Sequence, residues 1–479
     1  MKKIILLIGF LSSLCLSGCQ INDDLKGEGS EESPYLIQST NDLLKFSSYI
    51  NQGKEKYMNA HVKLTNDLNM KNTSMKPIGG LDFHYFNGTF DGDNHSISNF
   101  KPHENYKMQG LFGENDKDCV IKNLNLSLNI TVKHSTAFVG GIIAHNTYGG
   151  LVENCHVTGS INFKTLHPSP ISTNAELVDK YSKEKEVYEH EEEEPKTVTK
   201  YYSKNKAGGI VGCNYGTIKD CTSSISITAD VVGGIAGTNA GKIINCESSD
   251  SNLYSTSATG GIVGFSNFVS HLKGVCEVTN CSSKNHTLLG ENYIGGVVGA
   301  ASGHLDVTHC QAYGIIKDTK QESTVIGGIV GGCVYQIGTI TSSTSNLSYW
   351  YLNMSLNVVS LQDCLSFNSI HLEDIKEQKS LLYFPMKASS TMSTTKFTNI
   401  IEQANIVKEE STSVKGSFNQ ERTNLYLIDN MEIKNIEGNK DLSELNKNII
   451  QESFNADLDN IVEIQVDDVT GFVFKTMNF

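Results

Sequence analysis

A short glycine-rich sequence recurs through the middle of the chain, and this repetition restricts the fold more than any other feature. Its copies read Gly-Gly followed by Ile or Val, a second apolar or small residue and then Gly or Ala. Paired glycines open the six regular copies at Gly140, Gly208, Gly233, Gly260, Gly295 and Gly327. These starts lie 68, 25, 27, 35 and 32 residues apart. A degenerate copy, Gly-Leu-Phe-Gly-Glu-Asn, begins at Gly110.

Each copy continues with a turn, an Ile or Val, a polar pair and a cysteine, as in Gly216–Cys221 and Gly241–Cys246. The apolar runs predict short strands, and Asn214–Gly216 and Asn239–Gly241 are expected to supply positive φ at tight corners. A single coil cannot bury its own apolar face, so successive coils should stack and share one core. The glycine pairs are expected where backbones approach too closely for a Cβ.

These repeats resemble the GLUG motif, which occurs in bacterial surface proteins with parallel β-helices. The resemblance covers roughly residues 110–370, with an insertion over 162–206. It implies an all-β fold, a right-handed parallel β-helix or solenoid.

Upstream, residues 34–109 resemble the segment that opens such domains and are expected to form an N-terminal cap and the first coils. Asn41 or Thr40 is expected to cap a short helix that buries one face. Laid over the first coil, this helix would cover an exposed strand edge. Its buried face would consist of Leu43, Phe46 and Ile50.

Six of the twelve cysteines occupy the same place in successive repeats. Leu124 holds that place in the degenerate copy, which indicates an apolar filler site. Exported proteins ordinarily use such cysteines for disulfides, but parallel neighbours rarely meet the required torsion, which favours a ladder of buried free thiols. Without Cys-x-x-Cys or paired histidines, no metal site is expected. The predicted ladder is Cys155, Cys221, Cys246, Cys281, Cys310 and Cys364.

The first residues predict export and lipid attachment. A positive start precedes an apolar stretch over 4–16, which is too short for a membrane helix and ends in small residues. The sequence Leu-Ser-Gly-Cys, ending at Cys19, resembles the bacterial lipobox. This implies that residues 1–18 form a signal peptide and that Cys19 is lipidated, so that the protein is an outer-membrane lipoprotein exposed at the cell surface. Residues 19–33 are polar and acidic and should form a flexible tether.

The charge balance excludes one class of partner. The net charge is −14 at pH 7, and Arg422 is the only arginine of the chain. Nucleic-acid binding depends on many cationic contacts with phosphate, so no nucleic-acid partner is expected. The same shortage argues against arginine clamps on anionic sugars.

Tyr349, Trp350 and Tyr351 form the one aromatic triplet with a tryptophan and are the candidate ligand-binding residues. Aromatic faces stack on sugars, although alternation along a strand would place Trp350 opposite the two tyrosines. The acidic insertion over 162–206 is either a solvated loop or part of a binding face.

The glycine repeats stop near Glu373, so residues 371–479 are expected to form a mixed α/β cap on the open end of the solenoid or a small separate domain. Helical spacing predicts helices over 395–407 and 442–454. A strand pair is predicted over 461–474, with its turn near 468–471.

No catalytic residues or cofactor are predicted. Asp91 and Asp93 are the carboxylate pair that a glycosidase would need, but Asp-Gly-Asp-Asn indicates a turn. GLUG repeats also accompany IgA-cleaving metallopeptidases, yet their His-Glu-x-x-His motif is missing here. The expectation is a non-enzymatic adhesion or binding protein, with a glycan or a host or matrix protein as partner. A carbohydrate-active β-helix enzyme (lyase or glycosidase) and a structural envelope protein remain the alternatives.

Overall fold

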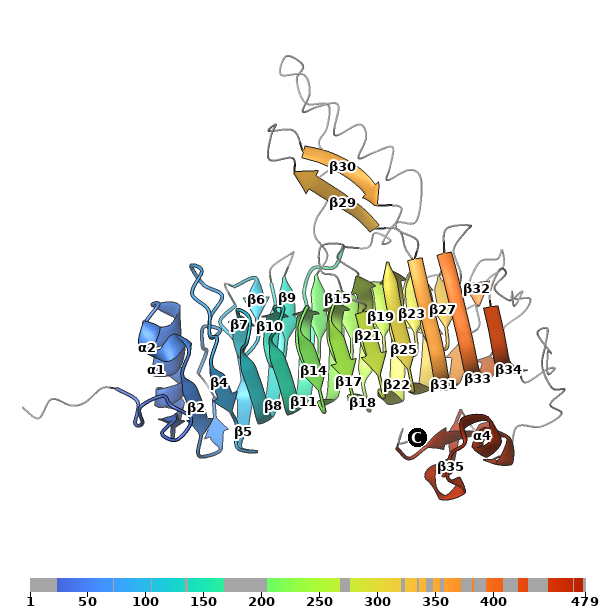
Figure 1. Cartoon of the computed structure of the whole chain (residues 1–479), viewed down its shortest axis with the longest axis horizontal. Helices are drawn as coiled ribbons and strands as arrows, with labels where there is room; N and C mark the ends of the chain where they lie inside the picture. Colours follow the sequence, from blue (N-terminus) through green and yellow to red (C-terminus); the bar gives the residue numbers. More distant parts are fainter. Residues whose placement is uncertain are drawn as a thin grey trace, which may run out of the picture.

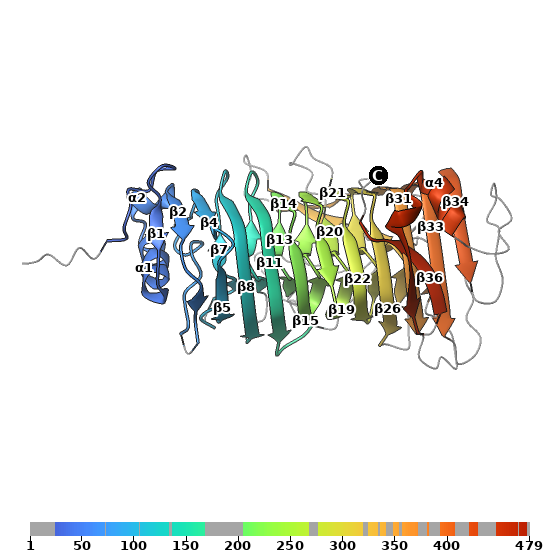
Figure 2. The ribbon, with the colours of Figure 1, turned by 90° about the horizontal axis from the view of Figure 1, so that it is seen from below.

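The computed structural model is dominated by parallel strands stacked in successive coils along one long axis (Figures 1 and 2). It describes residues 24–476 except 72, 105, 134–136, 168–204, 268–275, 320–323, 334–335, 342–347, 354–356, 372–380, 383–392, 408–420, 430–446 and 468. Within these residues, no helix combines the length and apolar character needed to cross a membrane.

One side of each coil belongs to a seven-stranded parallel sheet. Its strands are β7 (Phe112–Glu114), β10 (Ile143–Asn146), β13 (Val211–Asn214), β16 (Ala236–Asn239), β20 (Val263–Asn267), β24 (Val298–Ser302) and β28 (Val330–Cys333). Each begins two residues after a glycine of the repeat. The pairing joins equivalent positions, so Val211 lies beside Ile143 in one neighbouring coil and Ala236 in the other. Equivalent positions of successive repeats therefore lie next to one another in the folded chain.

The remaining sides of the coils form a 25-stranded sheet whose paired strands are parallel. Its first strands are β1 (Tyr35–Ile37), β2 (His61–Leu64), β3 (Leu68–Asn69), β4 (Thr89–Asp91), β5 (Ser96–Phe100), β8 (Val120–Val132) and β11 (Leu151–Phe163). Further along lie β14 (Thr217–Lys219), β15 (Thr222–Gly233), β17 (Lys242–Ile244), β18 (Glu247–Ser249), β19 (Asn252–Gly260), β21 (Cys276–Thr279), β22 (Ser282–Gly290), β25 (His304–Thr308), β26 (Gln311–Asp318), β31 (Asn357–His371), β33 (Ser393–Val407) and β34 (Glu421–Asp429). Short strands end at or just before the first glycine of the repeat: β6 (Met108–Gln109), β9 (Phe138–Gly140), β12 (Lys206–Gly208), β23 (Tyr293–Gly295) and β27 (Val325–Gly327), with β32 (Leu381–Leu382) beyond them.

The glycine pairs lie where backbones meet, as the sequence predicts. A Cβ built on Gly233 would lie 2.0 Å from the carbonyl oxygen of Ala236 and 2.6 Å from the amide nitrogen of Gly264. Real Cβ atoms essentially never approach backbone this closely. The chain can therefore turn from β15 into β16 only because no side chain is present there.

The predicted positive φ at Asn214–Gly216 is wrong. The left-handed residues of the repeat are instead the Asp or Asn just before each ladder cysteine, with φ of 52° at Asp220 and 55° at Asn245. Asn214 has a different role, because its buried amide donates to Asn239 Oδ1 at 2.8 Å and accepts from Asn146 Nδ2 at 2.8 Å. Stacked amides satisfy one another inside the coils and hold the corner without a left-handed residue.

A short helix covers the N-terminal end of the stack, as expected (Figure 1). Helix α1 (Thr40–Asn51) begins one residue earlier than predicted, because Ser39 is the N-cap and accepts a hydrogen bond from the Asp42 amide. Its Phe46 ring packs edge-on against Phe86 at 5.3 Å. A second short helix, α2 (Glu55–Met58), follows.

The prediction of a helix over 395–407 is wrong. This segment is strand β33, which pairs in parallel with β31, and β34 pairs in turn with β33. The stack therefore continues past residue 370 without further glycine pairs. The predicted strand pair over 461–474 is confirmed as the antiparallel strands β35 (Ile461–Val466) and β36 (Val469–Phe474).

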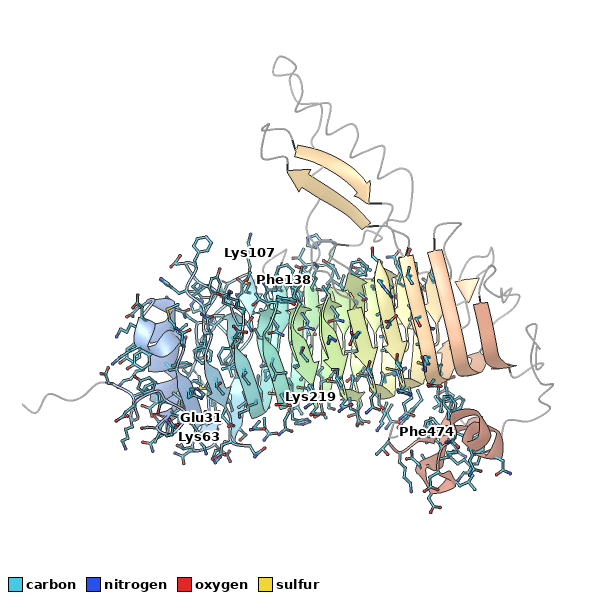
Figure 3. All side chains as sticks on the ribbon, in the orientation of Figure 1. Glu31, Lys63, Lys107, Phe138, Lys219 and Phe474 are labelled. Carbon is cyan, nitrogen blue, oxygen red and sulfur yellow. The ribbon has the colours of Figure 1, made fainter. Side chains whose placement is uncertain are left out.

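The C-terminal elements lie against the flank of the stack rather than across its open end. Helix α4 (Lys447–Phe454) and the hairpin β35–β36, which are connected through the turn η1 (Leu458–Asn460), form a small apolar cluster with Leu365 of β31 (Figure 1). Gln311 Nε2 donates to the Phe474 carbonyl at 2.9 Å, and Phe474 is labelled in Figure 3. These elements pack on the flank because Leu365 offers an apolar side chain there. In the earlier coils the same column is polar, for example at Glu247.

Candidate functional site

The predicted aromatic triplet lies in a hairpin apart from the coils. Strand β30 (Ser348–Asn353) pairs antiparallel with β29 (Gln336–Thr341), and the two form a separate two-stranded sheet (Figure 1). Trp350 is the register partner of Thr339, and the two flanking tyrosines, Tyr349 and Tyr351, pair with Ile340 and Gly338. The side chains of this hairpin, like Cys19 and most of the 162–206 insertion, lie outside the residues that the structure describes in detail.

The six predicted ladder cysteines are buried and stack in successive coils (Cys155, Cys221, Cys246, Cys281, Cys310 and Cys364). The backbone amide of Cys155 lies 3.5 Å from the sulfur of Cys221, and Cys155 is the register partner of Leu124. The thiols bond to backbone carbonyls two residues earlier, as Cys246 does to Ile244 at 3.3 Å. All ten cysteines of the described residues are free. Burial raises the pKa of Cys155 and Cys246, whereas hydrogen bonds with the neighbouring ladder cysteines lower the pKa of Cys221 and Cys281.

The candidate carboxylate pair lies in a turn, as predicted. The Asp93 amide and the Asn123 side chain both donate to Asp91 Oδ1 at 2.9 Å. Burial raises the pKa of Asp91, but these hydrogen bonds and Lys122 hold it below its usual value overall. The Asp93 carboxylate pairs with Lys63 at 3.0 Å. Each carboxylate is thus engaged by cross-coil contacts.

A buried carboxylate fixes the base of the 162–206 insertion. Asp230, which is fully buried, accepts hydrogen bonds from the His167 amide at 2.6 Å and the Asn205 amide at 3.0 Å. The His167 ring and the Thr256 hydroxyl contact it as well, at 2.8 and 3.1 Å. Both ends of the insertion are therefore held on the same carboxylate.

A further group of polar side chains lies on the seven-stranded sheet, which sequence reasoning missed. Glu114, His145, Cys213 and Thr238 occupy the same position of four successive strands, β7, β10, β13 and β16. We call these four residues the thiol cluster. The repeat itself carries the signal, because each of them precedes the asparagine that follows the glycine motif. Their chemical types differ, so the column does not appear as a conserved motif.

Hydrogen bonds connect the thiol cluster from coil to coil. His145 Nδ1 lies 2.8 Å from Glu114 Oε1, and a hydrogen bond also joins the His145 ring to the Cys213 thiol. The Thr238 hydroxyl lies 3.1 Å from the Cys213 sulfur. The Tyr215 ring packs edge-on against His145, with centroids 5.3 Å apart. A carboxylate, an imidazole and a thiol therefore lie on three successive coils, each in contact with the next.

The electrostatics of the thiol cluster favour charge separation. Burial alone would lower the pKa of His145, but hydrogen bonds with Cys213 and Glu114 raise it to about 9. Burial alone would raise the pKa of Cys213, whereas its hydrogen bond with His145 and the charge of Lys206 hold that pKa below its ordinary value. Cys213 thus has an imidazole as its partner, whereas the ladder thiols contact one another and backbone groups.

Across the described part of the chain, no three His, Cys, Asp or Glu side chains adopt an arrangement that could hold a metal ion. The thiol cluster is included in that statement.

Comparison with known proteins identifies the repeat. The family model described as the GLUG motif matches residues 139–162 and 205–228, each of which holds parts of one coil. A crystal structure provisionally described as an immunoglobulin A1 protease from Bacteroides ovatus aligns with 79% of this chain and 86% of that chain, at 18% identity and a TM-score of 0.40.

Two relatives match shorter stretches. A provisionally named Gly-rich membrane protein of Evansella cellulosilytica is 30% identical over 135 residues, which are 27% of this chain and 15% of that protein. Halomucin of Haloquadratum walsbyi is 30% identical over 148 residues, 28% of this chain and 2% of halomucin. This chain thus spans only a small part of either relative. The two segments matched by the family model identify this chain as a protein that contains GLUG repeats.

Proposed function

We propose that this protein is a surface-exposed lipoprotein of the outer membrane whose right-handed parallel β-helix presents a binding site and catalyses no reaction. The partner is an extracellular glycan or a host or matrix protein. The observation that carries the proposal is the shape: a long stack of coils with a separate aromatic hairpin beside it (Figure 1). Such a scaffold holds a recognition element away from its point of attachment.

Three further observations support this reading. The Leu-Ser-Gly-Cys sequence that ends at Cys19 resembles the bacterial lipobox, which supports lipid attachment there. One relative is named as a membrane protein and another is halomucin, which is consistent with a place in the cell envelope. The strand pairs of the coils use backbone groups internally, whereas the β29–β30 hairpin pairs only with itself. That hairpin carries the aromatic triplet, whose ring faces are suited to stacking on sugars.

A binding screen tests the proposal on cells that display the full chain. Glycan arrays and matrix proteins are probed with these cells and with cells that produce Trp350→Ala. We expect at least one glycan or matrix protein to be retained, and Trp350→Ala to weaken that retention about tenfold, as loss of one stacking contact does. Tyr148→Ala is the matched control, because Tyr148 is an exposed aromatic (70%) in the turn after β10, and its loss should change nothing.

The alternatives give different results in the same experiment. The cells are incubated with the same polysaccharides, and the polymer length is measured. Depolymerisation that depends on the protein would establish a carbohydrate-active enzyme instead. Display of the folded chain without any retained ligand would favour a structural envelope protein.

A further inference from the structure

The thiol cluster combines three groups that nucleophilic catalysis by sulfur requires. His145 and Cys213 are direct register partners on β10 and β13, and Glu114 is the partner of His145 on β7. Because His145 Nδ1 contacts the Glu114 carboxylate at 2.8 Å, the Nδ1 proton points at the carboxylate and Nε2 is left for the thiol. An activated nucleophile generally lies beside a base, and a third group orients that base.

Cys213 is placed differently from the ladder cysteines. Its sulfur receives a hydrogen bond from the Thr238 hydroxyl at 3.1 Å and is joined to the His145 ring by another, whereas the ladder sulfurs contact backbone groups and one another. The main apolar core does not include Cys213. Phe138, at the edge of the stack opposite Lys219 in Figure 3, packs beside His145 with centroids 6.2 Å apart.

Solvent reaches the cluster from the side of its acid and base. Cys213 is 6% exposed, and the side chains of His145 and Glu114 are 21% and 19% exposed. The imidazole and the carboxylate are thus partly exposed while Cys213 is nearly buried, so a reagent that reaches the sulfur has to be small. This limits the partner to compact reagents.

We propose that Cys213 is a nucleophilic thiolate, activated by His145 and Glu114, and that it is a covalent modification site for small carbon electrophiles. The thiol proton moves to His145 Nε2. The sulfur then attacks the electrophilic carbon, the carbon–sulfur bond forms, and the bond to the leaving group breaks with both electrons going to that group. With iodoacetamide as the probe, the products are a thioether and iodide, and no oxidant or reductant is consumed.

The neighbouring charges favour the ion pair. Lys206 lies on the adjacent strand, with its ammonium 5.0 Å from the centre of the Phe138 ring, and lowers the pKa of Cys213. Tyr215 faces the same sulfur, and burial together with Cys213 raises its pKa, so it stays neutral. Cys276, which interacts electrostatically with Tyr215, has a pKa that burial raises to about 11 and also stays neutral.

The test is alkylation of the folded full chain with iodoacetamide, followed by peptide mass spectrometry, between about pH 6 and 9. We expect Cys213 to react at least about tenfold faster than the ladder cysteines near pH 7, with a rate that changes little over this range. His145→Asn should lower the rate near pH 6 about tenfold and restore a rise with pH like that of an ordinary thiol. Glu114→Gln should have a smaller effect in the same direction.

His156→Asn is the matched control, because His156 lies on β11 with Thr222 as its partner and is outside the thiol cluster. It should leave both the rate and its pH profile unchanged, and circular dichroism checks that each variant is folded. Two outcomes would overturn the proposal. One is a Cys213 rate that rises with pH in the unmodified sequence as it does in His145→Asn. The other is Cys213 labelled only after denaturation.

Discussion

Individual polar residues have distinct energetic roles in this stack because each coil places them in a fixed column. The buried amides of Asn146, Asn214 and Asn239 bond to one another, so none is left unsatisfied between coils. Left-handed Asp220 and Asn245 also bond across coils, at 3.0 Å. Removing one member leaves its neighbours with buried unpaired groups, which costs more than the bond itself contributes.

His286 makes stability depend on pH in the acid range. It is buried, accepts from Ser283 at 2.7 Å and donates to Asn368 Oδ1 at 3.0 Å, so both nitrogens are satisfied by a neutral ring. Burial lowers its pKa to about 4, below the unfolded value of about 6.5. Because the unfolded chain takes up the proton first, its contribution to stability is full above pH ~6.5 and is lost as the pH falls towards 4.

The free energy of unfolding is expected to fall by about 3 kcal/mol as the pH falls from ~6.5 to ~4. Denaturant titrations at several pH values measure it, and His286→Gln should be less stable at neutral pH while losing this part of the acid dependence. An unchanged slope between pH ~4 and ~6.5 in the variant would show that His286 is not the titrating group.

The cysteine ladder stabilises by packing rather than by covalent bonds. Cys246, 1% exposed, lies between Cys221 and Cys281 in the column. Cys246→Ala should lower the free energy of unfolding by about 1–2 kcal/mol through the space it leaves. Thermal melting of the full chain should be the same with and without a reducing agent, and a fall in melting temperature on reduction would contradict the assignment.

At the scale of the elements, the turn from a short strand into the seven-stranded sheet depends on glycine. Gly233→Ala would place a methyl group against the Ala236 carbonyl and the Gly264 amide, neither of which can move without disturbing the strand pairing. We expect a loss of at least about 3 kcal/mol in chemical denaturation. Gly332→Ala is the control, because its Cβ would meet only side chains of Tyr293 and Val325 at 3.2–3.3 Å. Equal losses in the two variants would argue against a backbone origin.

The repeat predicts the glycine turns and the cysteine column well, but it does not predict which residues adopt the left-handed conformation at the corners. Glycine pairs such as Gly233-Gly234 and the cysteine column could be located because one coil corresponds to one copy. The choice between Asn214 and Asp220 for the left-handed corner could not be made, since both residue types suit turns. It depends on the stacked amides, which exist only once the coils are in register. The thiol cluster was hidden for a related reason, because stacking joins residues of different type.

For the whole molecule, the sequence marks the stack but not its extent. The apolar spacing in strand β33 also suits a helix, and the segment forms a strand because it pairs with β31. The flank position of the C-terminal hairpin follows from one apolar residue, Leu365, in a column that is polar in the earlier coils. Such choices depend on contacts between distant segments, which local patterns do not contain.

Digestion of intact cells with a non-specific protease tests most directly whether this stack of coils stands outside the cell on a lipid anchor. Cells that produce the full chain should lose it to the protease while a periplasmic marker survives, and Cys19→Ala should no longer fractionate with the membrane. If the chain resists the protease until the outer membrane is broken, or if Cys19→Ala fractionates as before, the surface-lipoprotein account is contradicted.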